Sequence, residues 1–383
     1  MSAPLTAPGR RPFRSPLRER DFRLMLLGTC AAFTGYALLL SVVPSWAVRQ
    51  GAGAFAAGAA TGVFMGSTVL AQLVVPALVR AYGYRTVLLL GASLLGLPAP
   101  LLILAVDAPW ILAISLLRGL GFGLLTVCGS ALIAELLPAD ALARGSGLYG
   151  LATGVPQLAG LPLGTLVASH WGFPPVFLLA AVLPLAAIVP FLLLPGLVPG
   201  REERTRIVST VDVTWRPWLV MIGGSIGFGA FVTFLPIVLP AHAALALLAV
   251  TATVLLARWA AGHAGDRFAA PGRMLPFALA LIALGLVVFA LGTRQPVAAI
   301  LAVAVFGIGF GVVQNDSLVA MFVRAPAGQA SVVWNVAYDA GQGLGAVAVG
   351  AAVAGIGYPG AFGLLAGVAV VLLPVAWRAG RSR

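Results

Sequence analysis

Twelve apolar stretches, each long enough to cross a lipid bilayer as a helix, make up most of this chain. The hydrocarbon core of a bilayer requires about 20 apolar residues per helical span. Because lipid offers no hydrogen-bond partners, a spanning segment must be a helix or part of a closed barrel. The stretches do not alternate in polarity as barrel strands do, so they are predicted to be helices. The predicted spans are 24–47, 54–79, 86–106, 109–137, 145–168, 175–194, 217–239, 243–262, 272–292, 297–323, 329–355 and 359–378.

The composition excludes a soluble globular protein. Hydrophobic residues make up 61% of the chain and charged residues only 9%, whereas soluble domains carry about 25% charged residues. The two cysteines, Cys30 and Cys128, both lie in predicted spans and show no metal-ligand spacing. The sequence therefore predicts an integral membrane protein with little mass outside the lipid.

The net charge of +12 is explained by topology. All 23 basic residues are arginines. If the amino terminus is inside the cell, 20 of them fall on the cytoplasmic side, only Arg49 and Arg294 fall outside, and Arg118 lies within a span. This is the positive-inside bias, and it predicts a multi-pass protein of the cell membrane with both termini in the cytoplasm. No nucleic-acid partner is expected.

The chain contains an internal repeat. A polar stretch at 196–216 separates six predicted spans from six. Gly121-Phe-Gly matches Gly309-Phe-Gly at an offset of 188, and Gly172-Phe-Pro matches Gly357-Tyr-Pro at an offset of 185. We therefore expect an all-α membrane protein with twelve transmembrane helices in two parallel, pseudo-symmetric halves. The expected division is a tail at 1–23, one half at 24–194, a cytoplasmic linker at 195–216, the second half at 217–378 and a tail at 379–383.

Two motifs give the chain a family resemblance. The segment after the eighth span reads Gly262-His-Ala-Gly-Asp-Arg and continues to Pro-Gly-Arg at 271–273, and the fourth span contains Arg118-Gly-Leu-Gly. These resemble the G-x-x-x-D-R-x-x-G-R loop motif and the fourth-helix arginine motif of the major facilitator superfamily. The resemblance implies that helices 1, 4, 7 and 10 line a central cavity. It also implies that helices 2, 5, 8 and 11 lie where the halves meet.

Charges in the lipid core are the best functional candidates, because each costs about 2.5–3.5 kcal/mol on insertion scales. They are Arg118, Asp316 and Asp339. Asp316 and Asp339 are expected to face a shared polar pocket, where a dry environment would favour the protonated form. Either aspartate would then exchange a proton, or it would have a structural role. Further transport or coupling candidates are the polar neighbours of the two aspartates: Asn315, Asn335, Tyr338 and Gln342.

A cytoplasmic gate is predicted from the loop after the eighth span, which holds Asp266, Arg267 and Arg273. A carboxylate is stabilised at a helix amino terminus. We expect Asp266 to contact Arg144 or the amides of residues 145 and 146.

The fifth span is unusually rich in glycine and proline. Small residues spaced four apart allow helices to approach closely, and prolines bend helices. The residues expected to pack or kink this span are Gly150, Gly154, Pro156, Gly160, Pro162 and Gly164.

These observations predict a secondary transporter that works by alternating access, without a cofactor and as a monomer. Proton-coupled efflux of a small, largely apolar compound is favoured by the glycine pattern of the fifth span and by candidate apolar cavity residues. Uptake or facilitated passage of a polar or anionic solute is the alternative. A membrane-embedded enzyme or a receptor is less favoured, because no catalytic constellation and no long tail are present.

Overall fold

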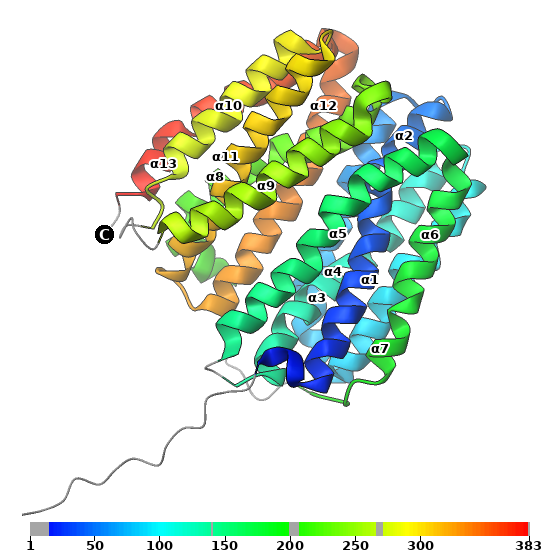
Figure 1. Ribbon diagram of the computed structural model, residues 1–383, viewed down its shortest axis with the longest axis vertical. Coiled ribbons are helices and arrows are strands. Elements are labelled where there is room, and N and C mark those ends of the chain that lie inside the picture. Colours follow the sequence, from blue (N-terminus) through cyan, green and yellow to red (C-terminus); the bar gives the residue numbers. More distant parts are fainter. Residues whose placement is uncertain (1–14, 139–140, 199–206, 266–270, 382–383) are drawn as a thin grey trace, which may run out of the picture.

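The computed structural model describes residues 15–138, 141–198, 207–265 and 271–381 (Figure 1). The predicted Asp266 and Arg267 lie outside these residues. Within them the secondary structure is helical, with short 3-10 turns. The α-helices are α1 Arg20–Leu40, α2 Val42–Arg49, α3 Gly53–Gly96, α4 Ala108–Leu136, α5 Leu142–Trp171, α6 Phe173–Ala186, α7 Ile188–Leu192, α8 Ile207–Val238, α9 Ala243–Gly265, α10 Leu275–Gly292, α11 Pro296–Phe322, α12 Ala327–Val371 and α13 Leu373–Ala379.

Ten helical segments are long and apolar enough to span a membrane. Two of them, Gly53–Ile103 and Gly328–Ala379, contain 51 and 52 residues. A helix rises 1.5 Å per residue, so each of these is long enough to cross a 30 Å core twice. The expectation of twelve passes in an all-α membrane fold is thus confirmed, although four predicted spans belong to two kinked helices.

Four of the glycines with positive φ make sharp turns, and these four form two repeat pairs. Gly83 (φ 79°) bends α3, and its counterpart Gly272 (φ 88°) precedes α10. Gly172 (φ 85°) separates α5 from α6, and its counterpart Gly357 (φ 65°) bends α12. Residues other than glycine rarely adopt a positive φ, so glycine is the residue that fits all four turns.

Helix packing repeats in the same way. Gly83 divides α3 into a first and a second part. In α4, a Cβ added at Gly123 would meet Ala71 in the first part, and a Cβ added at Gly121 would meet Leu95 in the second part. In α11, Gly311 packs on α9 and Gly309 on α10. Each glycine-rich helix is therefore wedged between two neighbours, which supports the internal repeat at the level of contacts.

The two halves form adjacent bundles, α1–α7 and α8–α13 (Figure 1). They meet where α3 packs on α12 and α5 packs on α9. We call the end of the bundle where α1 begins and α13 ends the terminal end, and the opposite end the distal end.

Candidate functional site

Small residues close the contact between the halves on the distal side. A Cβ at Gly343 of α12 would lie 3.0 Å from Met65 and 3.5 Å from Gly62 of α3. One at Gly350 would lie 3.3 Å from Gly58. Such short approaches allow backbone-to-backbone packing of membrane helices. The distal part of the interface is therefore closed in this conformation.

A buried hydrogen bond joins the halves beyond these glycines. Nε2 of Gln72 on α3 donates to Oδ2 of Asp339 on α12 at 2.6 Å. The same nitrogen lies 3.3 Å from Oγ1 of Thr126 on α4. In the described part of the chain, no other side chain hydrogen-bonds to Asp339, and no basic group pairs with it. The carboxylate, 3% exposed, therefore has one neutral amide as its partner.

Asp339 lies deep in the membrane. It follows the start of α12 at Ala327 by twelve residues, which at 1.5 Å per residue is about 18 Å along the helix. A typical hydrocarbon core is about 30 Å thick. This depth places the carboxylate near the middle of the bilayer, where ionisable groups are rare and usually functional.

Stacked aromatic rings lie beside the Gln72–Asp339 hydrogen bond in both halves. In the first half, the rings of Tyr36 and Phe122 stack with centroids 3.8 Å apart. In the second half, Phe228 stacks on Phe310 at 5.1 Å, and Tyr338 is nearly parallel to Phe310 at 6.1 Å. The Tyr338 hydroxyl lies 3.5 Å from Oε1 of Gln157 on α5. Tyr338 therefore also connects the two halves.

Arg118 is buried in the first half, at 3% exposure. Its Nε donates to the Leu95 carbonyl at 3.1 Å and its Nη2 to the Gly35 carbonyl at 3.5 Å. The guanidinium also lies 5.8 Å from the ring centre of Phe64. Arg118 forms no ion pair with an acidic residue within the described ranges.

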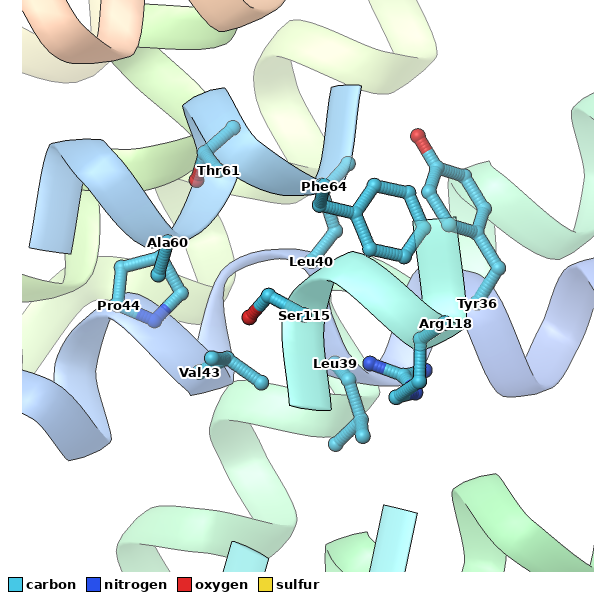
Figure 2. A pocket seen from close by; sticks show the side chains of 10 residues that line it. All are labelled: Tyr36, Leu39, Leu40, Val43, Pro44, Ala60, Thr61, Phe64, Ser115 and Arg118. Carbon is cyan, nitrogen blue, oxygen red and sulfur yellow. The ribbon is translucent and has the colours of Figure 1, made fainter. Parts of the chain in front are cut away.

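Arg118 lines a small pocket between α1, α2, α3 and α4 (Figure 2). In Figure 2, the Tyr36 hydroxyl points away from the guanidinium. That hydroxyl is buried without a hydrogen-bond partner among the described residues. The lining residues are Tyr36, Leu39, Leu40, Val43, Pro44, Ala60, Thr61, Phe64, Ser115 and Arg118.

A second arginine faces the aromatic rings of the other half. Arg258 of α9 donates from Nη1 to Oε1 of Gln314 at 3.2 Å, and its guanidinium lies 5.7 Å from the ring centre of Trp334. Arg258 is one of the 20 arginines that the positive-inside bias assigns to the cytoplasmic side. Its side chain points into the bundle, because this part of α9 packs against α11.

Asp316 does not share the site of Asp339, in contrast to the expectation. Its Oδ1 and Oδ2 accept hydrogen bonds from the backbone N–H groups of Gly272 and Met274, each at 2.9 Å. Carboxylates readily accept backbone amides at helix starts. Asp316 thus fixes the turn that leads into α10, near the terminal end.

The other polar candidates have separate surroundings. Nδ2 of Asn335 donates to the Ser331 carbonyl of its own helix at 2.8 Å. Asn315 is half-buried, and a Cβ at Gly262 would lie 3.7 Å from its Oδ1. Gln342 is 1% exposed, and both polar atoms of its side chain are unpartnered in the described part of the chain.

The predicted gate is only partly described. Arg144 and Arg273 are exposed. Gly145 packs on Leu137 and Ile133 of its own half. The proposed contact of Asp266 with this region lies outside the described residues.

The fifth-span residues divide into two groups on α5. Gly160 packs on Ala37 and Gly164 on Leu38, both of α1. In contrast, Gly150 has no neighbour within 4 Å of an added Cβ, and Gly154 has only Leu255 at 3.7 Å. The helix continues through both Pro156 and Pro162. Among the four glycines of this set, close packing is thus found at the two distal ones, Gly160 and Gly164.

Sequence reasoning did not single out Tyr36, Gln72 or Phe122. One signal was available: Phe122 and Phe310 occupy the same place in the repeat, at the offset of 188. Gln72 is a polar residue inside an apolar span, but nothing in the sequence pairs it with Asp339, which lies 267 residues away.

The sequence model of the Major Facilitator Superfamily matches residues 25–331. The chain belongs to this superfamily. Major facilitator proteins are membrane transport proteins, and the many apolar helices of this chain make it a multi-pass member.

Two relatives come from Mycobacterium tuberculosis. The "Probable multidrug-efflux transporter Rv1634" is 32% identical over 219 residues, which is 56% of this chain and 45% of that protein. The "Uncharacterized MFS-type transporter Rv1877" is 28% identical over 188 residues, or 45% of this chain and 26% of that protein. Each match covers less than half of the relative's length.

Solved major facilitator structures share the fold over nearly the whole chain. The partially occluded inward-open xylose transporter XylE from E. coli aligns with a TM-score of 0.76 and 14% identity, covering 94% of this chain and 97% of that one. The nucleoside transporter NupG aligns with a TM-score of 0.72 and 12% identity, covering 95% and 100%.

Proposed function

We propose that this protein exports small, largely apolar compounds across the cytoplasmic membrane in exchange for protons. Both termini would lie in the cytoplasm, as the arginine distribution indicates, and the protein would act as a monomer. The printed name of the relative Rv1634, a probable multidrug-efflux transporter, supports export. The stacked rings of both halves offer apolar surface for the transported compound.

Asp339 is the proton carrier in this proposal, and its contact with Gln72 is the observation on which the proposal depends. A buried carboxylate without a basic partner is costly when charged, so it binds a proton readily. It also lies where the halves meet. A group in this place is exposed to one side or the other as the halves rock.

The hydrogen bond gives protonation a mechanical effect. When Asp339 is charged, it is a strong acceptor for the Gln72 amide and ties α3 to α12. When Asp339 is protonated, it is a weaker acceptor, and the tie loosens. Asp339 would take up a proton from outside and release it inside, while the compound moves in the opposite direction.

The proton gradient and the membrane potential supply the energy. One charge that moves through 100 mV releases about 2.3 kcal/mol. At 1.4 kcal/mol per decade, this supports roughly fifty-fold accumulation.

The test is a liposome assay with an internal pH dye and a panel of small apolar compounds. Wild type should give a compound-triggered pH change, and Asp339→Asn should abolish it. The matched control is Asp316→Asn, which removes a charge from a residue that holds a turn rather than the interface. Proton flux that persists in Asp339→Asn would refute the proposal.

Arg118 favours a second candidate function, facilitated passage of an anionic solute. Its buried guanidinium lacks an acidic partner in the described residues, and an anionic group on the solute would provide one. This function predicts transport that is lost in Arg118→Ala but insensitive to a protonophore.

A further inference from the structure

The two halves carry matching aromatic pairs. Phe122 of α4 and Phe310 of α11 are repeat counterparts. Each ring stacks on a ring from the first helix of its own half: Phe122 on Tyr36 of α1, and Phe310 on Phe228 of α8. The interplanar angles are 16° and 26°. A pair of near-parallel rings is therefore present in each half.

Further rings stack on each pair with nearly parallel planes. Phe64 stacks on Tyr36 at 25°, and Trp334 stacks on Tyr338 at 11°, as Tyr338 does on Phe310. Tyr338 also reaches the opposite half, where its hydroxyl lies 3.5 Å from Oε1 of Gln157. The ring series of the second half therefore extends to the interface. Aromatic faces bind other flat aromatic molecules by offset stacking.

The charged side chains near these rings carry a net positive charge. Arg118 lies over Phe64, and Arg258 lies over Trp334. In the described part of the chain, Asp339 is the one acidic residue at this interface. With Asp339 charged, the three groups sum to one positive charge, and with Asp339 protonated, they sum to two. A permanent cation is repelled in both states, and the arginines already occupy nearby ring faces by cation–π contact.

One polar group at the rings is available for a ligand. The Tyr36 hydroxyl is buried, with the side chain 1% exposed, and it has no hydrogen-bond partner among the described residues. It points away from Arg118 (Figure 2). An unpartnered buried hydroxyl is costly, and a polar substituent of a bound molecule would satisfy it.

We infer that the transported compound is a flat polycyclic aromatic molecule that has a hydrogen-bonding substituent and no permanent positive charge. It binds between the ring pairs of the two halves, with its polar substituent at the Tyr36 hydroxyl. This inference rests on the proposed function and names the substrate class of the same site.

Two planar tricyclic probes test the charge rule together with the need for a hydrogen-bonding substituent. Acridone is flat, neutral and fluorescent and has a carbonyl acceptor, whereas 10-methylacridinium is a permanent cation. Binding to the purified full-length protein in lipid nanodiscs is measured by fluorescence polarisation. Benzophenone, which has two aromatic rings and a carbonyl but is twisted, competes with acridone in a third measurement.

Acridone should bind at least ten-fold more tightly than 10-methylacridinium or benzophenone. Tyr36→Phe should weaken acridone binding about ten-fold while leaving the fold intact, because it removes only the hydroxyl. Phe122→Leu and Phe310→Leu should each weaken it by a similar factor. Phe277→Leu, at a residue 68% exposed toward the lipid, is the matched control and should bind as wild type does.

Equal or tighter binding of 10-methylacridinium would overturn the inference, and so would acridone binding that is unchanged in Tyr36→Phe and in both leucine variants. An absence of binding by all three probes would overturn it as well. The proposed function is decided separately. If 10-methylacridinium triggers a proton flux that requires Asp339, proton-coupled export holds and the substrate class is wrong.

Discussion

Nε2 of Gln72 donates a hydrogen bond to Oδ2 of Asp339 at 2.6 Å, and this bond joins helices from opposite halves of the chain. Both side chains are almost fully buried. The distal glycine contacts of α3 and α12 fix how closely these helices cross. A change in the charge of Asp339 therefore acts directly on the contact between the two halves.

A double-mutant cycle measures this relationship. Gln72→Leu and Asp339→Asn should each change the thermal stability. The effect of the combined variant should differ from the sum of the two single effects. Hydrogen bonds to charged groups contribute about 1.5–3 kcal/mol, which sets the coupling expected from denaturation of the four proteins. Additive effects would show that the two side chains do not interact in the membrane.

Asp316 should affect stability rather than coupling. Asp316→Ala leaves the N–H groups of Gly272 and Met274 without their acceptor, and each unsatisfied buried group costs about 1–3 kcal/mol. A lower melting temperature is expected, with proton flux per folded molecule unchanged. Asp316→Asn keeps one acceptor oxygen and should be intermediate. Loss of flux at normal stability would instead return Asp316 to a coupling role.

Alanine substitutions at glycines test which of these positions require glycine for stability. Gly272→Ala and Gly83→Ala force a side chain into a positive φ, which costs roughly 1–2 kcal/mol. Gly150→Ala should be neutral or stabilising by up to about 1 kcal/mol, because alanine favours a helix interior and the site is open. Thermal unfolding of the three variants distinguishes these outcomes. Destabilisation by Gly150→Ala would reveal a packing contact made in another conformation.

Orientation in the membrane can be measured by cysteine labelling. In a background of Cys30→Ala and Cys128→Ala, single cysteines replace Ser15 at the terminal end or Gln295 in the distal turn before α11, both exposed. A membrane-impermeant maleimide added to intact cells should label Gln295→Cys only. Ser15→Cys should require permeabilised cells. The reverse pattern would place both termini outside and contradict the arginine bias.

The fold was largely predictable because hydropathy fixes where the chain must cross lipid. The turns at Gly83 and Gly357 were predicted as breaks between separate spans, and the backbone at both glycines is indeed non-helical. Arg80 and Arg85 flank the first turn and marked it in the sequence. The second turn has no charged flank, so only the repeat of Gly172 marked it.

The candidate site was predictable in part. Asp339 stood out because a carboxylate in an apolar span is rare. Its partner Gln72 did not, because the contact depends on how α3 crosses α12. Asp316 was expected beside Asp339 but holds the turn before α10, for a related reason. Near a helix end, a side chain can turn toward a loop or toward the bundle, and tertiary packing decides which.

The single-residue turns also limit the surface that a binding protein can contact at the distal end of the molecule. Gly357 reverses α12 at the distal end, Gly172 alone separates α5 from α6, and three residues separate α2 from α3. Little protein therefore projects beyond the lipid there. An antibody or nanobody raised for structure determination would find a small distal epitope, and a grafted helix at one of these turns would give it a larger one.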